Sequence, residues 1–536
     1  MIGALLGKRQ KIPADQRART VDEHPDALDA ATYTSAVDSP AGAQPSPSPA
    51  RTAGERAIMN TAYRTAGEIT GRFASLLLFA QAGRSLGENG LGAFVFAVVF
   101  TGIVMIPVNL GLDRYTLRSI AEERSRAGGL FFNVLALKLA VGVPMFGLSF
   151  VGLHFTGTSA AAQETCWVIA PGVFCDSLAR TLLAVFAANE RNGPPAAADL
   201  INRLLSAALG IAALRVGFGV VSVGVTYSIG SASAVIIGFV LMRRTIGIPT
   251  GTLHLRGWPA LASRSLPFFV QDLFTTLLSI LDTFILSELA TQTDVGRYGA
   301  AYRLFESTYF IPGALVGAFS AMYTYLGPDS TPPLNSVYQR SIKLAVTLMM
   351  PLGVALMVLP GPICRLVYGS AFDSAAPALR ILGPAVVLLG VITLTISLLV
   401  SRGEPGRTAS LSGIMVAVNV ALNLLLIPLF TVTGAAAAML ATEVIFTVWI
   451  GHRALRMVGH VEWASMLAGA LAAGVGMAAV AALLHTNLAA ALVASTLTYL
   501  VVLVAVDWLI SPRDVVFVAG MVRRRLPSRS APRAPS

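Results

Sequence analysis

Stretches of about twenty predominantly apolar residues recur from residue 61 to residue 510, separated by short polar connections. A helix needs about twenty such residues to cross the hydrocarbon core of a bilayer. The strict alternation that is typical of membrane β-barrels is absent, so backbone hydrogen bonds must be satisfied within helices. The pattern predicts an all-α polytopic protein with about fourteen membrane helices, at residues 61–83, 91–112, 130–153, 166–188, 196–216, 218–241, 266–288, 297–325, 340–363, 377–400, 407–429, 432–451, 464–484 and 488–510.

Composition agrees with this pattern. Of the 536 residues, 55% are apolar and only 12% are charged, whereas soluble proteins carry roughly 25% charged residues. Lipid must therefore be the solvent for much of the chain, and we expect a multi-pass protein of the cell (inner, cytoplasmic) membrane. The formal net charge of +11 comes mostly from arginines dispersed at helix ends, so no nucleic-acid partner is expected.

The basic residues also predict the orientation. Connections after odd-numbered helices carry only Arg84, Arg215, Arg297, Arg365 and Arg380. Connections after even-numbered helices carry many more, namely Arg114, Arg118, Arg124, Arg126, Arg191, Arg243, Arg244, Arg256, Arg264, Arg340, Lys343, Arg402, Arg407, Arg453 and Arg456. Because basic loops remain on the cytoplasmic side, both termini are predicted to be cytoplasmic.

Polar, Pro/Ser-rich tails that cannot bury a core flank the helical region. Within that region, the string starting at Leu91-Gly92-Ala93 resembles the one starting at Val295-Gly296-Arg297, six helices later, and a second, looser match relates residues 188–194 to residues 401–407. Two parallel lobes with a central cavity follow from such a repeat. The predicted organisation is a disordered cytoplasmic tail (1–58), a six-helix lobe (59–241), a cytoplasmic connection (242–265), a second six-helix lobe (266–452), two additional helices (453–510) and a basic cytoplasmic tail (511–536).

Four groups of short motifs resemble the polysaccharide repeat-unit (O-antigen/oligosaccharide) flippases of the multidrug/oligosaccharidyl-lipid/polysaccharide exporter superfamily. They occur in the family's order and cover about residues 60–455. The groups are Leu86-Gly87-Glu88-Asn89-Gly90-Leu91-Gly92 with Asn109-Leu110-Gly111-Leu112; Leu266-Pro267-Phe268, Asp282 and Val295-Gly296-Arg297-Tyr298; Val367-Tyr368-Gly369 with Ala376-Pro377-Ala378-Leu379-Arg380; and Asn419-Val420-Ala421-Leu422-Asn423 with Gly434-Ala435-Ala436.

The resemblance implies a flippase that moves polyprenyl-pyrophosphate-linked oligosaccharide by alternating access, for exopolysaccharide, O-antigen or capsule assembly. It also implies a lipid-linked glycan and membrane lipid as partners, with a polysaccharide polymerase and glycosyltransferases as further candidates. A cation-coupled multidrug or metabolite antiporter of the same superfamily is the nearer alternative. A membrane glycan polymerase or ligase is the enzymatic alternative, which the short outer loops disfavour.

Charges inside membrane helices are costly and need a reason. Four pairs have helical spacing on one face: Glu68/Arg72, Asp176/Arg180, Asp199/Arg203 and Arg303/Glu306. Each pair could simply lower its own burial cost. Alternatively, arginines that face the cavity bind pyrophosphate, because guanidinium meets phosphate oxygens in pairs.

The candidates for substrate binding are Arg72, Arg180 and Arg303. Their predicted depths are the inner half, the middle and the outer half of the membrane, so that they could serve successive stages of passage. In the family that the chain resembles, helices 1, 2, 7 and 8 line the cavity, which favours Arg72 and Arg303.

The candidates for ion coupling or gating are Asp272, Asp282 and Glu306. Asp272 and Asp282 have no partner on their own helix; the same holds for Glu443 and Lys138. An interhelical salt bridge between Asp282 and Arg303 is one expectation, and a proton or sodium site is the other. Asn419 and Asn423 are expected to hydrogen-bond a neighbouring helix.

Chemistry of other kinds is not indicated. There is no phosphate-binding loop of the form G-x-x-x-x-G-K-[ST], no paired-carboxylate or nucleophile constellation and no metal-ligand spacing, so no catalytic residue, cofactor or metal is expected. The three cysteines, Cys166, Cys175 and Cys364, lack redox spacing and are expected to be small buried hydrophobic residues.

Overall fold

The computed structural model describes residues 53–155, 157–191, 193–248, 251–326 and 333–510. The contacts divide the chain into Met1–Glu55 and Arg56–Ser536, and the second unit holds everything described below. The described residues form helices joined by short turns, without strands. The predicted tails at 1–52 and 511–536 lie outside the described residues, whereas residues 53–58, expected in the tail, already belong to a helix.

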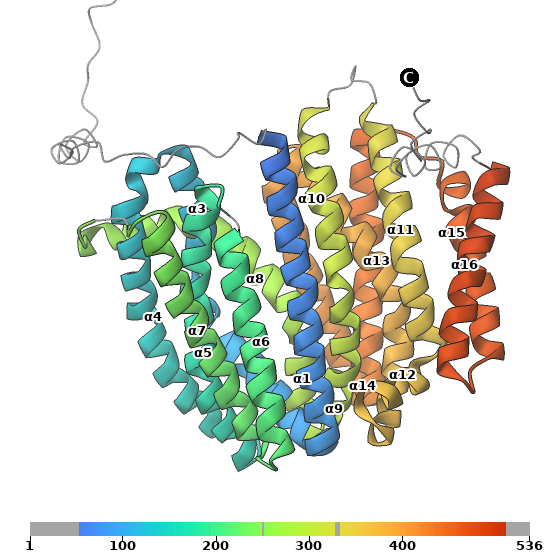
Figure 1. Cartoon of the computed structure of the whole chain (residues 1–536), viewed down its shortest axis with the longest axis horizontal. Coiled ribbons are helices and arrows are strands. Elements are labelled where there is room, and N and C mark those ends of the chain that lie inside the picture. Colours follow the sequence, from blue (N-terminus) through green and yellow to red (C-terminus); the bar gives the residue numbers. More distant parts are fainter. Residues whose placement is uncertain (1–52, 156, 192, 249–250, 327–332, 511–536) are drawn as a thin grey trace, which may run out of the picture. The chain divides into compact units, whose positions relative to one another are not determined.

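In the described part of the chain, sixteen α-helices and four 3-10 segments follow one another (Figure 1). They are α1 (Ala53–Val104), α2 (Ile106–Asn109), α3 (Leu112–Glu122), η3 (Arg124–Arg126), α4 (Ala127–Phe155), α5 (Ala160–Ala188), α6 (Gly193–Arg215), α7 (Val220–Thr245), η4 (Leu255–Gly257), α8 (Trp258–Leu289), α9 (Gln292–Glu306), η5 (Ser307–Tyr309), α10 (Phe310–Tyr325), α11 (Leu334–Val358), α12 (Pro360–Tyr368), η6 (Ser370–Ala375), α13 (Ala376–Ser401), α14 (Pro405–Val458), α15 (Trp463–Leu483) and α16 (Leu488–Ile510).

The predicted set of fourteen spans is confirmed. Among the residues that the structure describes, eleven helices are long and apolar enough to cross a membrane. Two of these contain two spans each, because the backbone leaves the helical region at Gly87 (φ 68°) in α1 and at Thr431 (φ 48°) in α14. One further span consists of α9, η5 and α10, whose separate pieces are short. The chain is therefore a multi-pass, all-α membrane protein.

Two lobes of six spans each make up the body of the fold. The first lobe contains α1–α7 and the second contains α8–α14. Their relationship is visible at two equivalent turns. Asn189, Glu190 and Arg191 donate backbone hydrogen bonds to the preceding helix in the same pattern as Arg402, Gly403 and Glu404, 213 positions later. Glu190 (φ 59°) and Gly403 (φ 80°) both adopt the left-handed conformation at the same point, which supports the repeat expected from the sequence.

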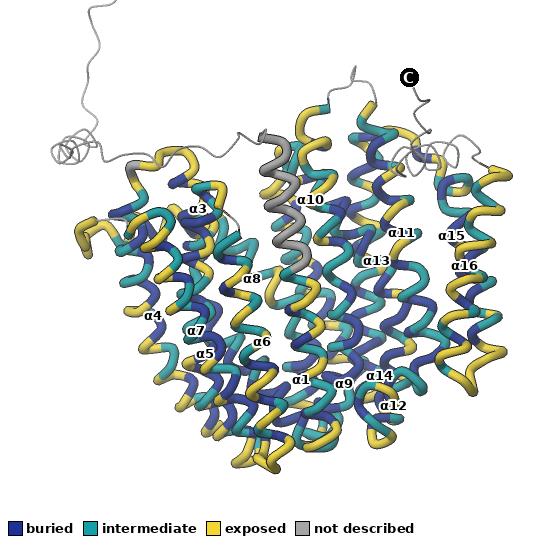
Figure 2. The backbone as a smooth tube through the Cα atoms, viewed as in Figure 1, coloured by how far each residue is buried: buried dark blue, intermediate teal, exposed yellow. Residues whose placement is uncertain are grey.

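The helix faces differ in how far their residues are exposed. Buried positions lie where helices meet and exposed positions lie on outward faces, as Figure 2 shows for α4 and α16. Many of the exposed residues are large and apolar. On α16 these include Val501, Val504 and Leu509, which are 67%, 56% and 75% exposed. Exposed aliphatic side chains in such numbers are stable only against lipid. The three cysteines form no disulfide, and two of them, Cys166 and Cys364, are buried as expected.

The additional pair, α15 and α16, is tied to the second lobe by polar contacts. The Lys343 ammonium on α11 lies 3.2 Å from Oδ2 of Asp507 on α16, and both side chains are 17% exposed. The Tyr499 hydroxyl donates to the Thr347 carbonyl at 2.8 Å. Gly469 of α15 makes room for the carboxylate, since a Cβ there would lie 2.3 Å from Oδ1 of Asp507.

Replacing Lys343 with Met should lower the free energy of unfolding by about 1–3 kcal/mol, because the Asp507 carboxylate would keep its burial and lose its ion pair. The melting temperature of the purified protein in detergent measures this effect. The double variant Lys343→Met/Asp507→Leu should recover most of the loss. A double variant as unstable as the single one would contradict this assignment.

Candidate functional site

One end of the interface between the lobes is closed by two glycines at a helix crossing. A Cβ on Gly92 of α1 would lie 1.9 Å from the carbonyl oxygen of Gln292, and a Cβ on Gly296 of α9 would lie 1.9 Å from that of Glu88. Gln292 lies four residues before Gly296, and Glu88 lies four residues before Gly92. Each repeat copy therefore makes the same contact with the other copy. Only glycine permits backbones to approach this closely.

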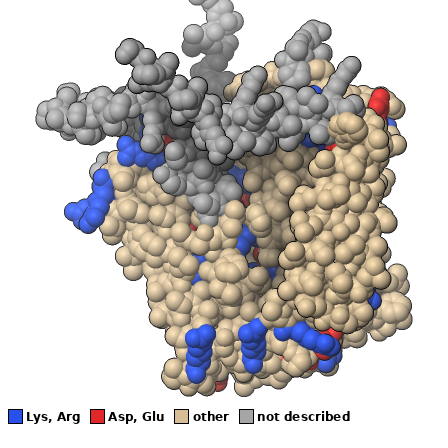
Figure 3. Space-filling model, turned by 45° about the vertical axis from the view of Figure 1, so that its right-hand side comes forward, with Lys and Arg blue, Asp and Glu red and all other residues tan. Residues whose placement is uncertain are grey.

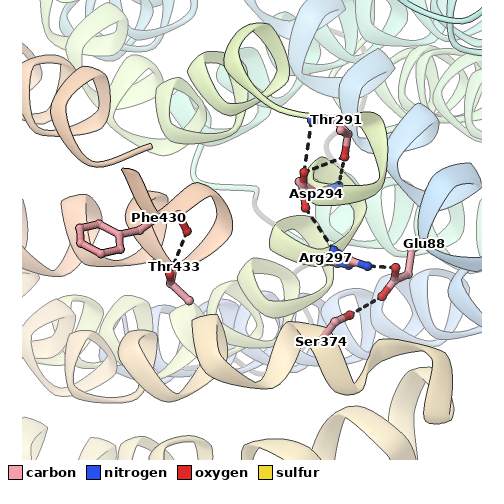
Figure 4. A network of polar contacts seen from close by, with 7 residues as sticks. All are labelled: Glu88, Thr291, Asp294, Arg297, Ser374, Phe430 and Thr433. Carbon is pink, nitrogen blue, oxygen red and sulfur yellow. Dashed lines mark hydrogen bonds and ion pairs between the residues drawn. The ribbon is translucent and has the colours of Figure 1, made fainter. Parts of the chain in front are cut away.

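A polar network surrounds this crossing (Figure 4). Arg297 donates from Nε to Glu88 at 2.9 Å and from Nη1 to Asp294 at 3.2 Å. Ser374 of η6 also donates to Glu88, and Thr291 with Asp294 forms the capping box that starts α9. Further contacts across the same end run from Arg84 to the Val367 carbonyl at 2.9 Å and from Gln292 to the Asn89 carbonyl at 3.0 Å.

Nearby, η6 is held to α12 by an ion pair. Arg365 contacts both carboxylate oxygens of Asp373 from Nε, at 2.7 and 2.8 Å. The segment that supplies Ser374 to the closure is therefore fixed by a charge-assisted pair.

Away from the closed end, the surface between two blocks of helices is hollowed, and charged side chains are visible inside the hollow (Figure 3). Charged groups at membrane depth are stable where they meet water or a partner. The positions of the predicted intramembrane charges therefore decide what the hollow can bind.

Arg72 of α1 reaches across to the second lobe. Its guanidinium pairs with Glu68 at 2.9 Å, donates to the Glu306 carbonyl at 3.1 Å, and lies 5.9 Å from the centre of the Tyr309 ring. Its side chain is 22% exposed. The predicted pair with Glu68 is present, and Glu306 and Tyr309 come from the opposite lobe.

Arg303 of α9 makes the reciprocal set of contacts. It pairs with Glu306 on its own helix at 2.7 Å, with the arginine side chain 23% and the glutamate 34% exposed. Its guanidinium lies 4.4 Å from the centre of the Phe79 ring, on α1 of the first lobe. Arg72 thus contacts the backbone carbonyl of Glu306 and Arg303 contacts its carboxylate, so both arginines approach the same residue. That they stand at successive depths in the membrane stays a prediction.

Arg180 of α5 is exposed, and its predicted pair with Asp176 is not among the ion pairs of the described residues. Asp176 instead accepts hydrogen bonds from Tyr227 at 2.6 Å and from Asn202 at 3.4 Å. Asp199 and Arg203 form their predicted pair at 2.9 Å, with the aspartate side chain 52% and the arginine side chain 35% exposed.

Asp272 and Lys138 find partners on other helices. Asp272 of α8 pairs with Arg114 of α3 at 2.8 Å, which links the two lobes near the end of the bundle opposite the glycine crossing. Gly111 touches α8 at the same place, where a Cβ would lie 2.3 Å from the Phe269 nitrogen. Lys138, fully buried, donates to Asp113 at 2.7 Å and to the Ser177 carbonyl at 2.8 Å.

Asp282 of α8 lies at the centre of a buried oxygen-rich cluster. Its Oδ1 accepts from Asn419 at 2.8 Å and from Asn423 at 2.5 Å, and Oδ2 accepts from Tyr298 at 3.3 Å. Asn419 also contacts Thr442 at 3.3 Å. The expected salt bridge between Asp282 and Arg303 is therefore wrong, because Arg303 is taken by Glu306. The expectation that Asn419 and Asn423 hydrogen-bond a neighbouring helix is confirmed.

Two atoms of this region lack a partner. Oδ1 of Asn423 and Oε2 of Glu443 are buried without a hydrogen bond among the described residues. An unsatisfied buried acceptor beside a carboxylate favours an occupant that brings positive charge or a donor. Among the described residues no three His, Cys, Asp or Glu side chains gather as for a transition metal, but carboxylate, amide and hydroxyl oxygens suit a hard cation.

Sequence reasoning missed the partners contributed by distant helices. Arg114, Glu88 and Tyr298 were not candidates, and the glycine pair was noted only as a repeat. The repeated strings around Gly92 and Gly296 were the one feature of the sequence from which this contact could have been predicted. Two copies of a motif that meet at a symmetry axis contact each other.

These features define a membrane transporter with two related lobes and a charged space between them. A protein-family model described as "Polysaccharide biosynthesis protein" matches residues 57–323, and one described as "MatE" matches residues 267–425. The chain belongs to the polysaccharide flippase family of the multidrug/oligosaccharidyl-lipid/polysaccharide exporter superfamily, and it is a transporter rather than an enzyme.

Two curated proteins of Haloferax volcanii are similar to this chain. One is "Probable low-salt glycan biosynthesis flippase Agl15", 24% identical over 71% of this chain and 79% of that protein. The other is "Probable flippase AglR", 22% identical with the same coverage. A lipid-linked glycan flippase is the function that these relatives support.

Solved structures share the fold. The inward closed conformation of lipid II flippase MurJ aligns with a TM-score of 0.70 at 15% identity, over 87% of this chain and all of that one. An inward-facing multidrug transporter of the MATE family aligns with a TM-score of 0.60 at 16% identity, over 75% of this chain and all of that one. At these identities the likeness concerns the fold alone.

Replacing Gly296 with Ala should open the closed end, because the new methyl carbon would lie 1.9 Å from the Glu88 carbonyl oxygen. Spin labels at the exposed positions Asn89 and Glu288 should report a longer distance than in the otherwise unchanged protein. Gly102→Ala is the matched control, since a Cβ on Gly102 meets nothing within 4 Å. An unchanged distance in Gly296→Ala would show that the crossing does not hold this end shut.

Proposed function

We propose that the chain translocates polyprenyl-pyrophosphate-linked oligosaccharide across the cytoplasmic membrane by alternating access, for exopolysaccharide, O-antigen or capsule assembly. The observation that carries this proposal is the meeting of Arg72 and Arg303, one from each lobe, at Glu306. Two guanidinium groups from opposite lobes can hold one pyrophosphate, since each offers paired donors to phosphate oxygens. Arg180 would add positive charge to the same space.

The predicted orientation of the basic loops indicates to which side of the membrane the hollow opens. With both termini in the cytoplasm, the Gly92–Gly296 crossing lies on the outer side and the hollow serves the cytoplasmic side. A head group would enter from the cytoplasm while its polyprenyl tail stays in lipid. Separation of the glycine crossing, with the Arg114–Asp272 pair kept, would then present the head group to the outside.

Coupling to a cation is the role that we assign to Asp282. Its carboxylate accepts hydrogen bonds from the Asn419 and Asn423 amide nitrogens, and Asn419 also contacts the Thr442 hydroxyl, so polar groups from α8 and both halves of α14 meet here. A sodium ion or proton would neutralise this buried carboxylate and supply what Oδ1 of Asn423 lacks. Asp272 and Glu306 are gating candidates, because Asp272 pairs with Arg114 of the first lobe and the Glu306 carbonyl accepts a hydrogen bond from Arg72 of the first lobe.

A cation-coupled multidrug or metabolite antiporter is the second candidate. The buried acids Asp282 and Glu443 favour it, as does the match of residues 267–425 to the MatE family model. Transport of a cationic dye by reconstituted protein, without movement of a lipid-linked oligosaccharide, would move the assignment to this function. The pair of facing arginines argues against a cationic substrate.

Replacing Arg303 with Ala should lower the translocation of a labelled lipid-linked oligosaccharide in proteoliposomes at least tenfold, because one of the two phosphate-binding groups is lost. Arg118→Ala is the control, since it removes a guanidinium from an exposed pair on α3 that involves neither Arg72 nor Arg303. Wild-type translocation by a correctly inserted Arg303→Ala protein would remove Arg303 from the site.

Replacing Asp282 with Asn should abolish the dependence of translocation on a sodium or proton gradient, since an amide neither needs nor attracts a neutralising cation. Translocation rates with and without each imposed gradient measure this dependence. The hydrogen-bond pattern is nearly kept in this variant, so folding should be retained. A full gradient response in Asp282→Asn would place the coupling site elsewhere.

A further inference from the structure

We infer that Glu68 and Glu306 are internal competitors for the head group: each carboxylate occupies one of the two arginines in the empty carrier and must leave when the pyrophosphate arrives. This inference rests on the proposed function, because it assumes that Arg72 and Arg303 bind the head group. According to this inference, the two glutamates determine how tightly the substrate binds and how fast it is released.

The geometry gives each arginine its own carboxylate, one helical turn away. Glu68 lies 2.9 Å from Nη2 and 3.2 Å from Nε of Arg72, so it contacts two donors of that guanidinium. Glu306 lies 2.7 Å from Nη1 of Arg303. These carboxylates take up donors that a phosphate would use.

Both carboxylates can leave their arginines without becoming buried alone. The side chains of Glu68 and Glu306 are 36% and 34% exposed, which is enough for a displaced carboxylate to be hydrated. By contrast, the intramembrane carboxylate of Asp282 is only 2% exposed and cannot be exchanged in this way. Partial exposure also makes the ion pairs weak enough to be broken by a ligand.

The arginines themselves remain in place when the carboxylates leave. Tyr309 of the second lobe faces Arg72 at 5.9 Å, and Phe79 of the first lobe faces Arg303 at 4.4 Å. A cation held over an aromatic face keeps its position without using its N–H donors in the guanidinium plane. Each ring comes from the lobe opposite its arginine, so the two guanidinium groups stay at the interface whichever anion they bind.

A carrier gains from this arrangement. Two unneutralised arginines at the interface would hold a pyrophosphate tightly and would repel each other in the empty state. With Glu68 and Glu306 present, the empty site has no net charge from these four groups, so the lobes can return after release. The carboxylates then lower head-group affinity and speed release, in the same way that transport sites must bind weakly enough to let go.

The sign of the effect on affinity separates a competitor from a residue that only positions an arginine. If the carboxylates compete, Glu68→Gln and Glu306→Gln should each lower the dissociation constant for inorganic pyrophosphate roughly two- to fivefold, given the strength of partly exposed ion pairs. The double variant should show about the product of the two factors, because the carboxylates act on different arginines. A positioning role predicts weaker binding instead.

Calorimetric titration of the full-length protein in lipid nanodiscs with inorganic pyrophosphate measures these constants. Glu306→Asp keeps the charge and should stay near the wild-type value. Glu122→Gln breaks an equivalent i,i+4 pair, with Arg118 on α3, and should change nothing. Melting temperatures check that each variant is folded, and Glu68→Gln alone tests the inference should Glu306→Gln fail to fold.

Transport gives the second readout. Proteoliposomes with a labelled polyprenyl-diphosphate-linked sugar should show slower turnover in the Gln variants despite their tighter binding. Unchanged or weaker pyrophosphate binding in both Gln variants, with binding lost in Arg303→Gln, would overturn this inference and leave the proposed function standing. Wild-type binding in both Arg72→Gln and Arg303→Gln would instead reject the arginine site itself.

Discussion

A charged side chain at membrane depth must have a partner or water, and this constraint organises the whole structure. Lys138 and Asp282 are buried and fully engaged in hydrogen bonds. Arg72, Arg303 and their glutamates are partly exposed and lie where the lobes face each other. The first kind holds helices together within a lobe. The second kind requires a wet space, and that space is what allows a carrier to accept an anionic head group.

Duplication explains how such a space is closed at one end. Two copies of one motif meet at a pseudo-two-fold axis, with Gly92 over the Gln292 carbonyl and Gly296 over the Glu88 carbonyl. Because each glycine covers a carbonyl of the other copy, moving one copy away breaks both contacts together. The repeat thus provides the seal at this end of the fold.

The sequence alone predicted the spans, the two lobes and the local pairs, because hydrophobic length and helical spacing are properties of neighbouring residues. Glu68–Arg72 and Arg303–Glu306 follow directly from such spacing. The sequence did not predict the partners of Asp176, whose hydrogen bonds go to Tyr227 and Asn202 on other helices. It predicted a wrong partner for Asp282, which Arg303 does not reach. Helix packing decides between partners there, and no spacing within one helix contains that information. The pairing of Asp272 with Arg114 was hidden for the same reason.

Water accessibility of position 306 tests the central claim most directly. In a background free of Cys166, Cys175 and Cys364, a cysteine replacing Glu306 should react with a membrane-impermeant thiol reagent supplied from the cytoplasmic side of oriented vesicles. Protection by added pyrophosphate should follow if the arginines bind it there. A cysteine that reacts only after denaturation would mean that these charges are locked in dry helix packing, and the account of a carrier with a passage between its lobes would be wrong.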